Sequence, residues 1–388
     1  MSPLLQLNAT WLRNRVAELG LRQWWLAEQL GVDRRTVLRW VNGQVRSIPP
    51  ARAAALAQVL ACRLEDLLLH EPGRELASAE DQRAAGLALA ASTLLDRLGP
   101  AGEWDVVEQL VKASAVPDLP VHVLGRLYHQ LSVACWRQDK LTEATVHNQT
   151  ALALAERCGD QALRADALGS QANLLLWRGD VAPALAAWRE ALALARWLTP
   201  RQRGALHSNL GAAWLEIGQL ASARAELRQA LACFETDGTP MNHSVLRAHL
   251  ALLALAEGDL DAAAREAKMS QSQARQGDYR RGLALAPLLL AVVAARRGQA
   301  DAARQNLAAS QAAFAELGVE DSLNQRLAAE VWRHLGHIDA ARRASQRARD
   351  LAADFPLERA AAEAELARVE AAALSPHVTG PLGASPLR

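Results

Sequence analysis

Residues 23–42 read QWWLAEQLGVDRRTVLRWVN, and this stretch predicts two short helices joined by a tight turn. Gln23 opens the first helix, in which apolar residues recur one helical turn apart. Gly31 can adopt the positive φ that ends this helix sharply. Asp33 can then cap a second helix by accepting a hydrogen bond from the backbone N–H of Thr36.

The second helix is basic on one side and apolar on the other. Arg34, Arg35 and Arg39 lie on the polar side, whereas Val37 and Trp40 are spaced to turn inward. A basic helix that follows a tight turn has the geometry that enters the major groove of DNA. The stretch therefore predicts a helix-turn-helix.

The flanking residues extend this motif to a bundle of five helices. Residues 10–19 predict an earlier amphipathic helix with a threonine cap, and Pro49 and Pro50 predict the start of a later one. The apolar face of the later helix comprises Ala53, Leu56, Ala57 and Leu60. Leu64, Leu67 and Leu68 are expected to close the bundle.

Residues 9–69 resemble the DNA-binding domain of the Cro/C1-type repressors, the XRE family. The matching residues are Gln23, Leu26, Ala27, Leu30, Gly31, Val32, Thr36, Val37, Trp40, Gly43, Leu56, Ala57, Leu60, Leu64, Glu65, Asp66 and Leu67. Residues 1–70 also hold nine arginines, five acidic residues and no lysine, a net charge of +4 in a chain of net charge +1. Positive charge is thus concentrated where phosphates would lie.

This resemblance implies sequence-specific binding to double-stranded DNA, and two groups of contact residues follow from it. Arg34, Arg35 and Arg39 are expected to face base edges, with Thr36 and Asn42 nearby. The residues expected to contact phosphates are Gln23, Gln44 and Arg46. The alternative is a five-helix bundle that has lost DNA binding.

The remaining composition is that of an intracellular, non-membrane protein. The four cysteines have no paired spacing, which favours reduced thiols and a cytoplasmic location. The amino terminus lacks a signal pattern. The longest apolar run, Leu283–Ala295, is 13 residues long and contains Pro287, so it is too short to span a bilayer.

Beyond residue 120 the sequence repeats. Gly179, Gly218, Gly258, Gly298 and Gly336 recur at intervals of 38–40 residues, and Asp139 stands where the first glycine would be. Small residues recur seven residues before, five after and twelve after each marker. They are Ser132, Ala172, Gly211, Ala251, Ala291 and Ala329; Ala144, Ala184, Ala223, Ala263, Ala303 and Ala341; and Ala151, Ala191, Ala230, Ser270, Ser310 and Ala348. Such spacing lets two antiparallel helices approach closely around a short turn.

This pattern resembles the tetratricopeptide repeat, about six times over. The fold is therefore expected to be all-α: a five-helix DNA-binding domain at residues 1–70 followed by a solenoid of helix pairs. The solenoid repeats are assigned to residues 121–374 and an amino-terminal helix pair or cap to residues 80–120. Residues 71–79 are expected to form a linker and residues 375–388 a disordered tail.

The first helix of each pair is expected to line a concave ligand-binding surface. The residues expected there are Arg126, His129, Gln130, Trp136, Arg137, Asp166, Ser170, Asn173, Trp177, Asn209, Glu216 and His249. The fifth and sixth pairs would add Leu285, Leu288, Leu289, Val292, Arg326, Glu330 and Arg333. Amide side chains suit the backbone of an extended peptide, because they both donate and accept. The alternative is that these are ordinary solvated helix faces.

No catalytic constellation, metal site or cofactor site is expected. The histidines are dispersed, and no glycine-rich phosphate loop is present. A head of this type on a helical-repeat body resembles the peptide-sensing transcription regulators of bacterial quorum sensing. The resemblance implies a homodimer that binds an operator and responds to a peptide or small effector. Two alternatives are a regulator whose repeats bind a protein partner, and a scaffold with a vestigial head.

Overall fold

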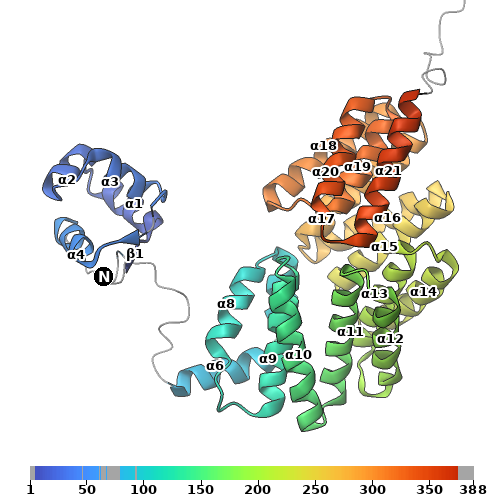
Figure 1. Cartoon of the computed structure of the whole chain (residues 1–388), viewed down its shortest axis with the longest axis horizontal. Coiled ribbons are helices and arrows are strands. Elements are labelled where there is room, and N and C mark those ends of the chain that lie inside the picture. Colours follow the sequence, from blue (N-terminus) through green and yellow to red (C-terminus); the bar gives the residue numbers. More distant parts are fainter. Residues whose placement is uncertain are drawn as a thin grey trace, which may run out of the picture. The chain divides into compact units, whose positions relative to one another are not determined.

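The computed structural model describes residues 5–45, 47–60, 62, 67, 79–91 and 94–374. Within these residues the protein is almost entirely helical, which confirms the expected all-α class (Figure 1). The chain divides into two compact units, Met1–Asp81 and Gln82–Arg388, which we call the head and the body. The predicted linker and tail lie outside the described residues, except for the last position of the linker.

The head contains four described helices and one small β-ladder. The helices are α1 (Ala9–Glu18), α2 (Gln23–Gln29), α3 (Arg34–Val41) and α4 (Pro50–Val59). Strand β1 (Leu5–Gln6) pairs antiparallel with β2 (Ser47–Ile48), which the sequence analysis did not predict. The predicted fifth helix lies largely outside the described residues, although Leu67 is buried.

The helix boundaries in the head follow from short-range capping. Gly31 has a φ of 58° and ends the α2 segment, as predicted. Two predicted caps were wrong in detail. Asn8, not Thr10, caps α1 by accepting from Trp11 N at 3.0 Å. Asp33 does cap α3, but its carboxylate accepts from Arg35 N at 2.7 Å rather than from Thr36 N.

A single apolar core holds the head together. It contains Leu7, Leu12, Val16, Leu26, Ala27, Val37, Trp40, Val41, Ile48, Ala53, Leu56, Ala57, Leu60 and Leu67. The predicted inward positions Val37 and Trp40 are both buried, as is the whole predicted apolar face of α4. Because these two helix faces are used for packing, the opposite face of α3 is left to solvent.

Three helices stand at the start of the body where the sequence predicted a pair, and the first of them begins three residues before the boundary at Gln82. They are α6 (Ala79–Ala91), α7 (Leu94–Ala101) and α8 (Trp104–Ser114). Six antiparallel pairs follow. They are α9 (Val121–Trp136) with α10 (Leu141–Cys158), α11 (Gln161–Trp177) with α12 (Val181–Ala193), α13 (Pro200–Glu216) with α14 (Leu220–Asp237), α15 (Pro240–Glu257) with α16 (Leu260–Gln276), α17 (Arg280–Arg296) with α18 (Ala300–Leu317), and α19 (Ser322–His334) with α20 (Ile338–Leu351). A short 3-10 turn (Ala195–Trp197) follows α12, and α21 (Pro356–Leu374) ends the array.

The turn between the two helices of each pair lies at the predicted marker residue. All six markers have a left-handed backbone, with φ of 60° at Asp139, 85° at Gly179, 77° at Gly218, 80° at Gly258, 72° at Gly298 and 77° at Gly336. Aspartate tolerates this region better than most residues, which explains how Asp139 replaces glycine.

Small residues let the paired helices approach closely, as predicted. All eighteen small residues at the three predicted offsets are buried. A Cβ added to Gly211 would lie 2.7 Å from the Leu227 side chain. Buried hydroxyls also tie the pairs together: Ser132 Oγ donates to Ala144 O at 2.9 Å, and Ser310 Oγ donates to Ala284 O at 2.8 Å.

The array curls so that distant pairs meet. Helix α7 contacts α17, and the α20–α21 connection lies against the end of α11. There, Phe355 packs edge-on against Trp177 with ring centroids 4.7 Å apart. Pro356 lies so close to Gly179 that a Cβ on that glycine would be 3.1 Å from the proline ring. None of the helices in the described ranges is both long and apolar enough to cross a membrane.

Candidate functional site

The solvent-facing side of α3 carries the three predicted base-reading arginines. Arg34, Arg35 and Arg39 are all exposed. None of them forms an ion pair or side-chain hydrogen bond with the part of the chain that the structure describes. An arginine fork without an internal partner retains all five of its donors for a ligand. Thr36 is half-buried beside them, at the edge of the apolar face.

The other predicted contact residues flank this helix. Gln23 is half-buried at the first position of α2, whereas Asn42 and Gln44 are exposed directly after α3. Arg46 lies outside the described residues. The structure therefore brings Asn42 and Gln44 to the carboxyl-terminal end of the same helix that carries the arginines.

Two further arginines of the head have structural roles. Arg13 Nε donates to Val41 O at 3.2 Å and so ties α1 to the end of α3. Arg15 pairs with Glu18 at 3.3 Å and reaches Leu60 O at 3.5 Å. Part of the positive charge of the head thus serves packing, and the exposed remainder is enriched on α3.

Several residues predicted for the ligand surface of the body form contacts between neighbouring helix pairs. Arg126 pairs with Asp160 at 3.4 Å. His129 Nε2 lies 3.0 Å from Ser170 Oγ, and Gln130 Nε2 donates to Leu89 O at 3.3 Å. Asp166 accepts from Gln202 Nε2 at 2.7 Å, and burial raises the pKa of its carboxyl. By contrast, Asn173 and Asn209 are half-buried and have no side-chain hydrogen bond among the described residues.

The predicted tryptophans form an aromatic cluster with other parts of the body. Trp136 and Trp177 meet edge-on with ring centroids 6.2 Å apart, and Phe355 covers Trp177. The Arg137 guanidinium lies 4.5 Å from the centroid of Trp136 and 5.7 Å from that of Trp104. These cation–π contacts hold Arg137 in place, and its guanidinium N–H groups have no hydrogen-bond acceptor within the described part of the chain.

An open cavity of about 450 Å³ lies next to this cluster. Three residues predicted for the first four pairs line it, namely Arg137, Glu216 and His249, and most of the remaining wall comes from α13, α15, α17, α19 and α21. The wall also contains Arg281, Arg296, Arg326, Arg368, Glu330, Glu358, Tyr279, Leu215, Leu252, Leu285, Leu323 and Leu357. Of the residues predicted for the last two pairs, Leu285, Arg326 and Glu330 line the cavity. Leu288, Leu289 and Val292 lie in the core instead.

Surrounding protein shifts the acid–base properties of two cavity residues. Glu216 reaches solvent through the cavity, but burial and the like charge of Glu358 raise its pKa to about 7. His249 contacts Ser208 Oγ at 3.2 Å, and burial together with the charge of Arg137 lowers its pKa to about 4. At neutral pH the cavity therefore holds a neutral imidazole and a partly protonated carboxyl group.

Comparison with known families decides what the head is. Residues 12–73 match the family of Cro/C1-type HTH DNA-binding domains. The chain carries a Cro/C1-type helix-turn-helix domain. No curated protein matches the chain.

Solved structures show the fold of the body. A Rap protein complexed with Competence and Sporulation Factor has a TM-score of 0.57 at 15% identity, covering 84% of this chain and 93% of that one. The APC/C hetero-tetramer Cut9–Hcn1 has a TM-score of 0.51 at 15% identity, covering 82% of this chain but only 51% of that one. PlcR of Bacillus thuringiensis, solved with the peptide PapR7 and DNA, is 12% identical and covers 70% of this chain and 98% of that one, with a TM-score of only 0.38. The body is therefore a helical-repeat solenoid.

The exposed face of α3 and the cavity of the body each contain residues that were not predicted from the sequence. In the Cro/C1-type head, Leu38 is 39% exposed on α3 between the arginines. Its position on the polar side of the helix was the available signal. In the cavity, Leu357 and Glu358 come from α21, which follows the last repeat and carries no marker residue. No periodic signal could have placed these two residues there.

Proposed function

We propose that the protein is a sequence-specific transcription regulator that reads DNA with α3 and senses an effector in the body. One observation carries the first part of this proposal. Arg34, Arg35 and Arg39 are exposed on the second helix of a Cro/C1-type helix-turn-helix and have no side-chain partner among the described residues. In this class of domain the second helix enters the major groove.

The side chains on α3 suit direct reading of bases. Arginine can donate two parallel hydrogen bonds to the O6 and N7 atoms of guanine, worth about 1–3 kcal/mol of discrimination per base pair. Leu38 lies on the same exposed side, where its methyl groups can contact a thymine methyl. Gln23 and Gln44 at the helix flanks suit phosphates, which set register without reading sequence.

Single-residue variants separate base reading from phosphate contact. A binding site is selected from random duplexes with the full chain, and affinities for it and for a scrambled duplex are then measured at fixed salt. Arg35→Ala should reduce the difference in affinity between the selected and the scrambled duplex, whereas Gln44→Ala should weaken binding to both duplexes by the same factor. Arg52→Ala removes an exposed arginine of the head that is not on α3 and is the matched control. An equal loss of selectivity between the two duplexes in Arg35→Ala and Arg52→Ala would contradict the assignment of Arg35 to base reading.

We propose further that the effector is a short peptide with a free carboxylate, bound in the cavity of the body. A volume of about 450 Å³ is in the range of small-ligand sites. Arg137 and Arg326 both line it and form no ion pair with the described residues. The leucine side chains of the wall can contact apolar side chains of the peptide, while Asn173 and Asn209, which are not in the cavity wall, form no side-chain hydrogen bond among the described residues. A similar fold, the Rap protein, was solved with Competence and Sporulation Factor, which also supports this proposal.

Equilibrium dialysis against pools of synthetic hexapeptides tests this assignment. Retained peptides are identified by mass and then resynthesised as free acids and as carboxyl-terminal amides. We expect the free acid to bind at least tenfold more tightly, and Arg137→Gln to remove that preference. Arg343→Gln alters an exposed arginine of α20 that lies outside the cavity and has no ion-pair partner among the described residues, and this variant should bind as the parent does. Retention of no peptide, or equal binding of acid and amide, would contradict the proposal.

We propose a homodimer as the DNA-binding form. One small head offers few base contacts, and two heads on inverted half-sites would place the half-site centres about 34 Å apart, or a multiple of that distance. Light scattering of the full chain, free and with the selected duplex, is expected to give the mass of two chains. A monomer in both states would contradict this.

A further inference from the structure

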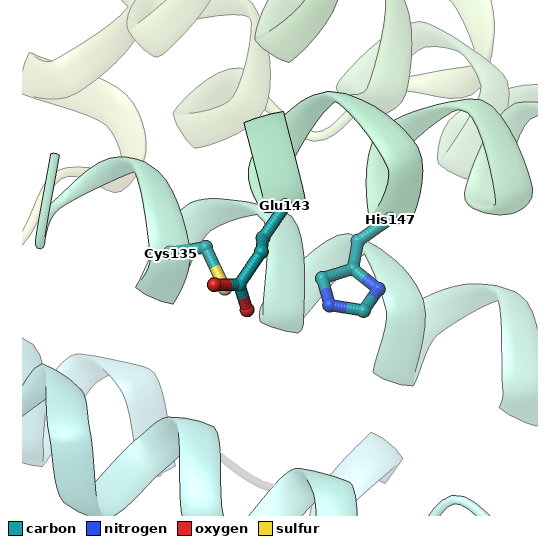
Figure 2. A group of neighbouring side chains, drawn as sticks. All are labelled: Cys135, Glu143 and His147. Atoms are coloured by element: carbon teal, nitrogen blue, oxygen red, sulfur yellow. The ribbon is translucent and has the colours of Figure 1, made fainter. Parts of the chain in front are cut away.

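Three potential metal ligands meet on the first helix pair, outside the set of residues that lines the cavity. Cys135 lies near the end of α9, and Glu143 and His147 lie on the facing helix α10. The thiol sulfur, a carboxylate oxygen and an imidazole nitrogen all lie within 4.8 Å of one another. Figure 2 shows the three groups side by side. No other group of this kind occurs among the described residues.

The spacing of the two residues on α10 explains half of this arrangement. Glu143 and His147 are four residues apart, so they share one face of the helix. The close packing of α9 against α10 then brings the Cys135 sulfur to that face. The sequence analysis predicted no metal site, and the spacing of Glu143 and His147 is the sequence signal for this group of ligands.

The donor set has the chemistry of a zinc site. Thiolate sulfur, imidazole nitrogen and carboxylate oxygen are the three donors that Zn²⁺ takes from proteins, at about 2.0–2.3 Å. Donors around a tetrahedral ion are then about 3.5 Å apart, so the three donor atoms, which all lie within 4.8 Å of one another, must approach each other by about 1.3 Å at most. We propose that Cys135, Glu143 and His147 bind one divalent ion of the zinc class, with water in the fourth position.

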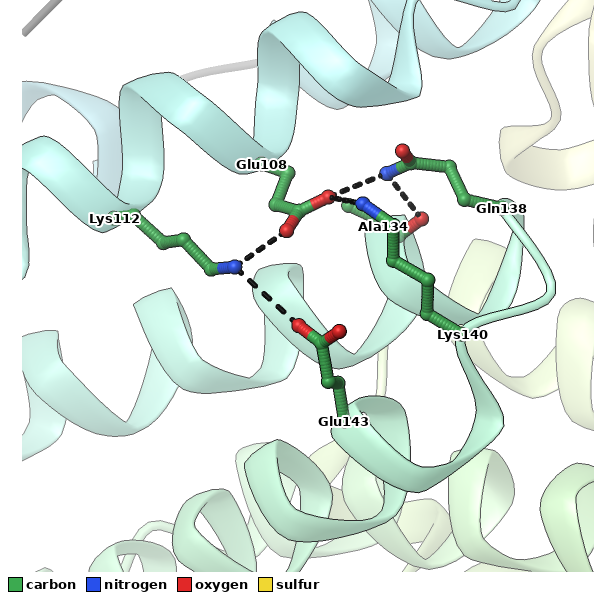
Figure 3. Close-up of polar contacts among 6 residues, drawn as sticks. All are labelled: Glu108, Lys112, Ala134, Gln138, Lys140 and Glu143. Carbon is green, nitrogen blue, oxygen red and sulfur yellow. Dashed lines mark hydrogen bonds and ion pairs between the residues drawn. The ribbon is translucent and has the colours of Figure 1, made fainter. Parts of the chain in front are cut away.

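The neighbouring ion pairs allow Glu143 to be recruited. Lys112 Nζ lies 3.4 Å from Glu143 but only 2.5 Å from Glu108 Oε1 (Figure 3). Glu108 also accepts from Lys140 at 2.7 Å and Gln138 at 2.8 Å. Although burial opposes it, hydrogen bonds from both lysines lower the pKa of Glu108 to about 2. Lys112 therefore keeps a charged partner when the Glu143 carboxylate turns to a metal.

The other two ligands are held by packing. His147 is half-buried, and its ring lies 5.9 Å from that of Tyr128, at an interplanar angle of 37°. Cys135 is fully buried, so the ion would sit between α9 and α10 and stabilise their pairing.

Cobalt binding to the full chain tests the proposal. After chelator treatment, Co²⁺ should produce a thiolate-to-cobalt charge-transfer band, and one equivalent of Zn²⁺ should abolish it. Cys135→Ala should lose the band. Because Cys135 is buried, Glu143→Gln and His147→Gln provide tests at the less buried positions, and each should weaken Co²⁺ binding at least tenfold. Cys158→Ala, which removes an exposed thiol from the end of α10, should retain the charge-transfer band and the Co²⁺ affinity of the parent.

A further variant tests the role of the lysine. Lys112→Gln should tighten Co²⁺ binding several-fold, because it removes a cation that competes for Glu143. The proposal is overturned if the parent chain gives no band or if the band persists in Cys135→Ala. It is equally overturned if both Glu143→Gln and His147→Gln bind Co²⁺ as the parent does.

Discussion

The head and the body are both all-helical, yet they are stabilised in different ways. The head packs bulky side chains such as Leu12, Leu26, Trp40 and Leu56 into one core. The body places alanine, glycine or serine at the eighteen repeated positions where paired helices approach, and adds buried hydroxyl–carbonyl hydrogen bonds such as that of Ser132. Ion pairs then link successive turns of the solenoid, for example Arg296 with Glu330 at 2.6 Å.

This difference in packing explains which side chains are not used in the core and can contact a ligand. A core of large side chains within a short chain uses one face of each helix fully, so the opposite face of α3 is free to contact DNA. A solenoid contacts only its neighbours along the array, and its inner side chains are shared between cross-links and a cavity. The residues proposed to bind a ligand in the body are therefore mixed with structural ones, whereas those proposed to contact DNA in the head are separated from the core by helix face.

The largest expected effect comes from removing a bulky core residue from one unit at a time. Trp188 is fully buried in the body and Trp40 is 3% exposed in the head. Each change to alanine should cost about 3–5 kcal/mol of the unfolding free energy of its own unit, through lost transfer energy and a cavity. Denaturant unfolding followed by circular dichroism and by DNA binding should show this. A loss of DNA binding in Trp188→Ala, with the body still folded, would contradict the separation of the two units.

The next effect comes from a buried ion pair of the body. Glu365 is 1% exposed and accepts from Arg333 at 2.9 Å and Arg368 at 2.7 Å. Arg333→Met should cost about 3 kcal/mol, because a buried carboxylate loses a partner. Arg304→Met, which breaks an exposed pair with Asp301, should cost less than about 1 kcal/mol. Equal costs in thermal unfolding would show that the inter-pair links contribute no more than surface pairs do.

The cavity should make the stability of the body depend on pH. The pKa of Glu216 is about 7 in the folded chain, above its ordinary value of 4.5. The folded state therefore holds this proton more strongly, and the resulting stabilisation is complete below pH 4.5 and is lost as the pH rises through 7. Glu216→Gln should reduce that decline, whereas Asp301→Asn, at a fully exposed carboxylate, should leave it unchanged. The unfolding free energy is measured by urea unfolding at several pH values. If it falls with pH equally in Glu216→Gln and in the parent, this prediction is contradicted.

The smallest effects concern the turn markers. A Cβ on Gly218 would meet no atom within 4 Å, so Gly218→Ala isolates the cost of a left-handed backbone, about 1 kcal/mol. Asp139→Gly places glycine at the equivalent turn and should stabilise the body by up to about 1 kcal/mol. Thermal unfolding of the two variants should shift in opposite directions. A shift in the same direction would mean that the two turns are not equivalent.

Local chemistry made much of this protein predictable from its sequence. Gly31, the turn markers and the eighteen small residues each specify a backbone angle or a close approach, and the structure confirms them. The predictions failed where contacts depend on the curl of the array. Phe355 covers Trp177, and Glu358 faces Glu216, only because α21 returns to the inner surface. That return depends on the summed rotation between pairs, which no single repeat encodes.

Selectivity for the chosen operator, expressed as the ratio of affinities for the selected and scrambled duplexes, tests the central claim most directly. The claim is that α3 reads the bases and the body does not. The full chain should show a ratio of about 10³ or more. The triple change of Arg34, Arg35 and Arg39 to alanine should bring this ratio close to one, while Arg137→Gln in the cavity should leave it unchanged. Retention of the parent ratio by the triple variant would contradict the account.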